Sequence, residues 1–142
     1  MLLSNELLFL TAEKTALSDA IGGFLRHLAV LVAEEPAAAA NRDFLAKILA
    51  AANLNLAQDA LLAEIPVNEA RVIAPDLSTH QPKQVLVFGL SPAQLGLSFE
   101  VPAYQPFNFY GCTWLFADRL STLEPDKTKK TQLWTALKQM FL

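Results

Sequence analysis

The chain has almost none of the residue types that carry nucleophilic or metal chemistry. Its 142 residues include one cysteine, Cys112, and two histidines, His27 and His80. A single cysteine excludes an intramolecular disulfide and fits a reducing compartment. Neither histidine stands in a pattern that pairs it with a nucleophile or with other metal ligands. We therefore expect no metal site, no cofactor and a cytoplasmic location.

Long apolar runs and excess positive charge are also missing. No uninterrupted apolar stretch approaches the ~20 residues of a membrane helix, and Asn5 and Glu6 interrupt the apolar N-terminus, which has no preceding basic cluster. We expect neither a membrane span nor a signal peptide. The net charge of −3 gives no global attraction to nucleic acid. The hydrophobic fraction of 53% is high for one small core and favours a surface that binds a partner.

Several short apolar runs predict buried strands. They are too continuous in their apolarity for strands with one wet face, and such strands are typical of parallel sheets. The clearest is QVLVFG, and an aromatic-rich segment predicts an edge strand through Phe109, a turn at Gly111 and a further strand. The runs are Leu28 to Val32, Ala60 to Ile65, Gln84 to Gly89 and Thr113 to Phe116.

Helical spacing of apolar residues predicts helices between these strands. Asn41 is a good N-cap for a helix that places Phe44, Leu45, Ile48, Leu49 and Ala52 on one face. Asp126 to Leu142 has a similar stripe, formed by Leu133, Trp134, Leu137, Met140 and Phe141. Ser91 and Pro92 predict an N-cap and first turn for a short helix over Ala93 to Leu97. Residues 1–25 form an N-terminal helical segment that continues through Leu17, Ile21 and Phe24, residues 69–73 a helical turn or short strand, and residues 75–82 an exposed loop.

Apolar strands that alternate with amphipathic helices predict an α/β fold. We expect one domain, residues 1–142, with a three-layer α/β/α architecture and a mainly parallel sheet of about four or five strands. Residues 1–25 would be its N-terminal helical segment. Nothing in the chain indicates an internal repeat or a linker.

The order of elements resembles the uracil-DNA glycosylase-like superfamily, and within it the small non-catalytic members represented by the psi subunit of bacterial DNA polymerase III. The glycosylases carry a Gly-Glu-x-Pro-Gly loop after the first strand, where this chain has Ala33, Glu34, Glu35, Pro36 and Ala37. The segments FLAKILAAANLNL, QVLVFGLSPAQLGL and LEPDKTKKTQLWTALKQMF resemble later parts of the family, over roughly residues 28–141.

The departures from the family pattern concern its chemistry. Ala33 and Ala37 carry β-carbons where the family's glycines let the backbone approach a base. The family's second motif supplies a histidine that stabilises the departing base, and here Ala117, Asp118 and Arg119 stand in its place. Some glycosylase families hold an iron–sulfur cluster with four cysteines, whereas this chain has only Cys112. The resemblance therefore implies a vestigial pocket without catalytic residues, formed by Glu34, Pro36, Ser91 and Asp118.

The resemblance implies a protein that binds partners. A psi-like subunit docks its N-terminal segment on the clamp loader and holds a second subunit with its α/β body. Leu3, Leu7 and Leu8 fit a docking segment, although they fit packing on the chain's own sheet equally well. The partner surface expected on the body is formed by Phe107, Phe109 and Tyr110, with weak nucleic-acid contact through Lys127, Lys129 and Lys130.

Two other functions stay open at this point. One is a divergent uracil-DNA glycosylase-like repair enzyme in which Glu34 or Asp118 positions water. The other is a scaffold with unrelated partners, because a fold alone does not fix a function.

Overall fold

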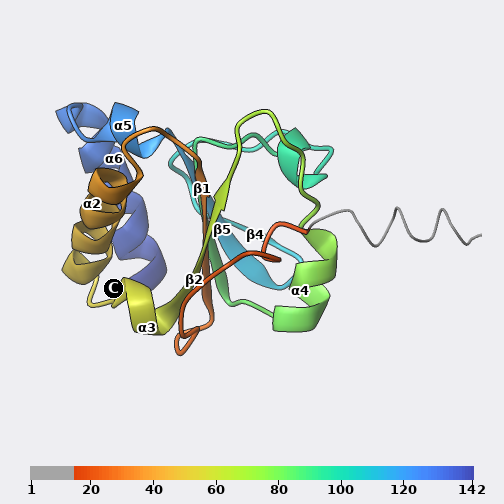
Figure 1. The fold of residues 1–142 in the computed structure, drawn as a ribbon. Coiled ribbons are helices and arrows are strands. Elements are labelled where there is room, and N and C mark those ends of the chain that lie inside the picture. The colour runs from red at the N-terminus through yellow and green to blue at the C-terminus, as the bar shows by residue number, and fades with distance from the viewer. Residues whose placement is uncertain (1–14) are drawn as a thin grey trace, which may run out of the picture.

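A computed structural model describes residues 15–142, and these residues form a three-layer α/β/α domain (Figure 1). Its five-stranded sheet has the order β2-β1-β3-β5-β4. The strands are β1 (Leu28–Ala33), β2 (Ala60–Ile65), β3 (Gln84–Phe88), β4 (Phe107–Phe109) and β5 (Cys112–Ala117). All neighbouring strands are parallel except β4, which runs antiparallel to β5 at the edge. The predicted fold class is confirmed.

Helices cover both faces of the sheet. In Figure 1, α2, α5 and α6 lie on one side of the strands and α4 lies on the other. The helical elements are α2 (Ala38–Ala51), α3 (Leu56–Asp59), α4 (Ala74–His80), the 3-10 turn η1 (Ala93–Leu95), α5 (Leu120–Leu123) and α6 (Lys127–Phe141). Among residues 15–142, no helix has the length and apolarity that crossing a membrane requires.

The continuous apolarity of β1 is explained by its central position. Every residue of this strand is buried, because alternate side chains enter two different cores. Leu28, Val30 and Val32 pack with residues of α2 and α6. Ala29 and Leu31 pack on the opposite face with residues of α4 and η1. A strand that is buried on both faces does not need alternating apolar and polar residues.

The two long helices agree with their predicted apolar stripes. In α2, Leu45 and Leu49 are buried, and in α6 the buried residues include Leu133 and Leu137. Asp126 caps α6 by accepting a hydrogen bond from the backbone N–H of Lys129 at 3.0 Å. However, α2 begins at Ala38, so Asn41 is a buried residue inside the helix and the prediction that it is the N-cap is wrong.

Three further predictions about elements are wrong. Residues 75–82, expected as an exposed loop, contain most of α4. Residues 15–25 are not helical, because Thr15 pairs with Val72 and Ile21 pairs with Leu62 of β2. Residues 69–73 form neither a helical turn nor a strand of the sheet, although Val72 makes that isolated bridge.

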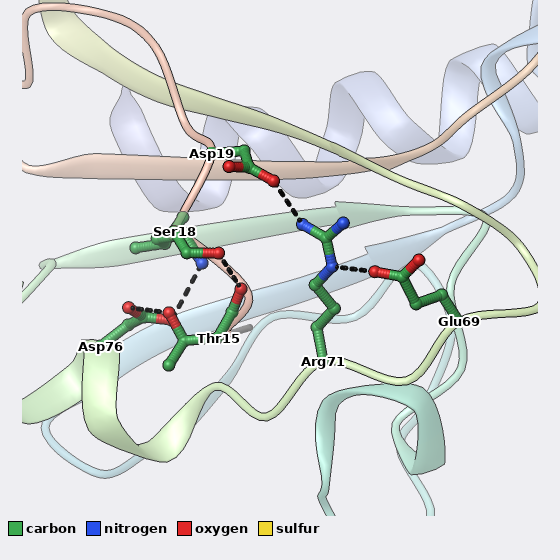
Figure 2. A network of polar contacts seen from close by, with 7 residues as sticks. Thr15, Ser18, Asp19, Glu69, Arg71 and Asp76 are labelled. Atoms are coloured by element: carbon green, nitrogen blue, oxygen red, sulfur yellow. Dashed lines mark hydrogen bonds and ion pairs between the residues drawn. The ribbon is translucent and has the colours of Figure 1, made fainter. Parts of the chain in front are cut away.

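A polar network attaches residues 15–19 to the face of the sheet that carries α4 (Figure 2). The buried carboxylate of Asp76 accepts hydrogen bonds from the Thr15 hydroxyl and from the backbone N–H of Leu17, both at 2.9 Å. The guanidinium of Arg71 is 5% exposed and contacts Asp19 at 3.2 Å and Glu69 at 2.5 Å. Buried charge is tolerated where such partners surround it. The network fixes residues 15–19 against this face of the sheet.

Candidate functional site

The carboxyl ends of β1, β3 and β5 lie at one edge of the sheet, as in other parallel sheets. Glu34 follows β1, Gly89 and Ser91 follow β3, and Asp118 follows β5. In the sheet, β2 lies on one side of β1 and β3 lies on the other. The direction in which successive strands are added therefore reverses at β1. Open α/β sheets bind ligands outside the carboxyl ends of their strands at such a reversal. The residues predicted to form a vestigial pocket therefore follow strands that end at this edge.

The chain itself packs closely around Gly89, the residue that follows β3. Gly89 has a φ of +79°, and its backbone N–H donates to the carbonyl of Ala117 at 2.9 Å. A β-carbon at this position would lie 2.4 Å from Cγ of Arg119 and 3.2 Å from Cβ of Ala33. The lack of a side chain at Gly89 therefore makes room for atoms of Arg119 and Ala33. Arg119 and Ala33 lie directly against the backbone of Gly89.

Glu35 ties the loop after β1 to two helices. Its side chain accepts hydrogen bonds from Nδ2 of Asn41 in α2 at 3.2 Å and from the hydroxyl of Ser121 in α5. Ala33, Glu35 and residues of α2 line a cavity of only about 10 Å³ here, no more than one water requires. Glu34 is exposed, and its backbone N–H extends the pairing of β1 with β2 by donating to the carbonyl of Ile65 at 2.8 Å.

Asp118 is held by two side chains. The hydroxyl of Tyr104 donates to Oδ2 of Asp118 at 2.5 Å, and Nζ of Lys129 lies 3.1 Å from the same oxygen. The hydrogen bond from Tyr104, helped by Lys129, lowers the pKa of Asp118. Burial and the contact with Asp118 raise the pKa of Tyr104. Asp118 is thus a stabilised carboxylate, which is a poor proton acceptor near neutral pH.

Ser91 caps the turn that follows β3. Its hydroxyl accepts from the backbone N–H of Gln94 at 3.3 Å, and Oε1 of Gln94 accepts from the backbone N–H of Ser91 at 3.1 Å. This reciprocal pair is a capping box. The helix expected over residues 93–97 is shorter, a single 3-10 turn. Pro36 is exposed at the start of the loop that leads into α2.

The three lysines predicted to contact nucleic acid lie in different settings. Lys129 forms the ion pair with Asp118, and Lys127 is exposed at the first position of α6. Lys130 lines a groove between α2 and α6. One of the three positive charges is therefore already balanced within the protein.

The predicted partner surface contains one residue that the sequence did not indicate. Phe107 and Phe109 are half-buried on β4, and Tyr110 is 58% exposed in the following turn. Phe99 is 37% exposed, and its ring centroid lies 4.8 Å from that of Phe109 and 6.4 Å from that of Phe107. We call Phe99, Phe107, Phe109 and Tyr110 the β4 aromatic surface.

Phe99 carries no local signal that assigns it to this surface. It lies outside the aromatic-rich segment, and only the tertiary fold brings its ring against β4.

The other predicted partner residues, Leu3, Leu7 and Leu8, lie outside the described residues. Cys112 is buried, and burial raises the pKa of its thiol. Within residues 15–142, no three His, Cys, Asp or Glu side chains are grouped to hold a metal ion.

Comparison with known proteins assigns no family to the chain. No protein-family model matches it, and no curated protein sequence matches it significantly.

Proposed function

We propose that this chain is a non-catalytic interaction module that resembles the psi accessory subunit of the bacterial DNA polymerase III clamp loader. The three-layer fold is compatible with the resemblance described from the sequence. The observation that carries the proposal is the close packing at the end of β3, where Arg119 and Ala33 lie against Gly89. Glu34, at the end of β1, lines a hollow of about 250 Å³ with residues of β2. Because the chain's own atoms cover the backbone of Gly89, the proposal assigns function to the outer surface of the domain.

The β4 aromatic surface supports a binding role for the body of the domain. Its rings lie beside an edge strand that pairs with only one other strand of the sheet. Exposed aromatic side chains are the residues most enriched at the centres of protein interfaces. We assign the second subunit of the assembly to this surface and the clamp loader to the N-terminal residues Leu3, Leu7 and Leu8. The proposal places the chain in the cytoplasm, where the single buried Cys112 stays reduced.

Binding to purified replication subunits tests the proposal. The full chain is mixed in turn with a bacterial clamp-loader complex and with its accessory subunit that contacts single-strand-binding protein, and co-elution is followed by gel filtration. We expect Leu7→Ser with Leu8→Ser to abolish only the first association. Phe99→Ser with Tyr110→Ser should abolish only the second.

Val67→Ser is the control for these surface variants, because Val67 is 44% exposed and lies outside the β4 aromatic surface. It should leave both associations unchanged. Failure of the unmodified chain to bind either component at micromolar concentration would refute the psi-like assignment. A scaffold with other partners would then be the better interpretation.

A divergent DNA glycosylase is the second candidate, because Glu34 and Asp118 both follow parallel strands at the carboxyl edge. The lowered pKa of Asp118 and its two partners argue against it as a general base. Purified protein is incubated with uracil-containing single-stranded and duplex DNA. We expect no base release above that of DNA alone. Release that disappears in Glu34→Gln would establish the enzyme instead.

A further inference from the structure

A second surface lies on the opposite side of the domain from α4, between α2 and α6. The groove there has a volume of about 150 Å³ and is lined mainly by apolar side chains. Leu133 and Leu137 form its buried floor, whereas Ile48 and Trp134 are partly exposed and Ala51 is exposed. An apolar cavity of about this size holds a benzene molecule in another protein. The α2–α6 groove therefore has room for one large side chain and not for a whole helix.

The two helices that form the groove are basic, although the protein as a whole is acidic. The chain has 14 acidic and 11 basic residues. Asp43 is the single acidic residue within α2 and α6. Their basic residues number six: Arg42, Lys47, Lys127, Lys129, Lys130 and Lys138. The layer formed by α2 and α6 therefore carries a net positive charge, whereas the rest of the chain carries a larger net negative charge.

Lysines stand beside the apolar floor. Lys130, Trp134 and Lys138 follow each other at four-residue intervals and so form one ridge of α6. Lys130 lines the groove, and Nζ of Lys138 lies 5.9 Å from the centroid of the Trp134 ring. Arg42 and Lys129 are engaged elsewhere, with Glu64 at 2.8 Å and Asp118 at 3.1 Å. The cations nearest the groove are therefore available to an acidic ligand.

We propose that the α2–α6 groove binds a short acidic peptide segment that inserts one large apolar side chain beside Trp134. The apolar floor favours a peptide over nucleic acid, since phosphate recognition uses converging cations rather than leucines. The lysines attract and orient the acidic residues on either side of the anchor. This inference does not depend on the psi-like assignment, which concerns β4 and the N-terminal residues.

A synthetic probe tests the groove directly. The probe is a fluorescein-labelled decapeptide of aspartate and glutamate with one central phenylalanine, titrated with the full chain by fluorescence anisotropy. A second peptide has serine in place of the phenylalanine. We expect the phenylalanine peptide to bind roughly tenfold or more tightly, because burying one large apolar side chain is worth about that much. Binding should weaken as salt is added.

Variants locate the bound peptide. Ala51→Glu places a carboxylate at the groove and should abolish binding, whereas Ala39→Glu changes an exposed alanine of the same helix and should not. Lys130→Glu with Lys138→Glu should weaken binding tenfold or more. Lys83→Glu, at an exposed lysine outside the helical layer, should have little effect. Binding should also change tryptophan fluorescence, and Trp134→Phe should remove that change while Trp114 remains buried.

Three results would overturn the proposal. The first is equal affinity of the two peptides, or no binding at millimolar peptide. The second is a single-stranded thymidine oligonucleotide that binds more tightly and displaces the peptide, which would make the surface a nucleic-acid site. The third is a dimer in sedimentation experiments that Ala51→Glu dissociates, which would place a second copy of the chain in the groove.

Discussion

At the scale of single residues, the carboxyl edge of the sheet is a structural junction. Asp118 is joined to Tyr104 and Lys129, and Glu35 is joined to Asn41 and Ser121. Each contact connects a strand end or loop to another element of the fold. A carboxylate acting as general base needs a pKa near the working pH, whereas the pKa of Asp118 is shifted downwards. These contacts stabilise the fold and leave Asp118 unsuited to proton transfer.

Removing the Tyr104 hydroxyl deletes its hydrogen bond to the Asp118 carboxylate and the one that it accepts from the backbone N–H of Asp118 at 3.2 Å. We expect Tyr104→Phe to lower the free energy of unfolding by about 1 kcal/mol at pH 7, a modest value because the Asp118 side chain is 39% exposed. The folded-state pKa of Asp118 is lowered, so this stabilisation is present above the unfolded pKa of about 3.9. It is lost as the pH falls through the folded-state pKa. Urea unfolding at pH 7 and at low pH should therefore give a difference that shrinks on acidification.

Tyr110→Phe is the matched control for this prediction. The Tyr110 hydroxyl lies 3.3 Å from the Ser78 hydroxyl in an exposed contact, with no carboxylate involved. Its removal should change stability little and equally at both pH values. A Tyr104→Phe difference that is the same at neutral and acid pH would show that the hydroxyl does not act through the charge of Asp118.

At the scale of elements, α6 depends on its first turn as well as on its buried face. The side chain of Asp126 accepts from the N–H of Lys129 at 3.0 Å, which satisfies a donor that the helix cannot pair internally. We expect Asp126→Ala to lower the free energy of unfolding by about 1 kcal/mol, measured by urea denaturation. Asp43→Ala removes an exposed carboxylate of α2 that is not its N-cap, and it should cost less. Equal losses would indicate that net charge, rather than capping, determines the effect.

The elements that the sequence predicted are those whose signal is local. The strands β1 and β3 are short apolar runs, and α6 combines a capping residue with a long apolar stripe. By contrast, α4 has seven residues that include Pro75 and only two buried side chains, Asp76 and Leu77. So short a helix is stabilised by tertiary packing rather than by its own pattern.

The same distinction applies to residues 15–25 and to the site. Ile21 has helical spacing from Leu17, yet it exchanges backbone hydrogen bonds with Leu62 of β2 at 2.9 and 2.7 Å. The sequence placed Glu34, Ser91 and Asp118 after strands that do end at one edge. It gave no sign that Arg119 would fill the space beside Gly89, because that contact depends on how two loops meet.

At the scale of the whole molecule, the two faces of the sheet are covered in different ways. One face carries the long helices α2 and α6. Within residues 15–142, the other carries α4, the turn η1 and irregular segments, among them residues 16 and 17, whose side chains are buried there. The cover on this second face is therefore assembled from pieces distant in sequence. Polar contacts such as those of Asp76 and Arg71 connect these pieces (Figure 2).

This arrangement predicts that Asp76 controls the attachment of residues 15–19, which we call the entry segment, to the rest of the domain. Replacing Asp76 by alanine leaves the N–H of Leu17 and the Thr15 hydroxyl without their acceptor. A buried donor without a partner costs about 1–3 kcal/mol. We expect Asp76→Ala to lower stability by that amount and to increase hydrogen exchange at residues 15–17 and in α4. Exchange in β1 and β3 should change only in proportion to the global loss of stability.

Asp76→Asn separates the roles of shape and charge, since an amide oxygen can accept a hydrogen bond in the same position. It should restore part of the stability and most of the protection of the entry segment. Ser78→Ala, at an exposed position of the same helix, should leave both unchanged. If Asp76→Ala raised exchange uniformly across the sheet, the entry segment would be an integral part of one cooperative unit. If exchange rises first at residues 15–17, that segment opens separately while the sheet remains folded.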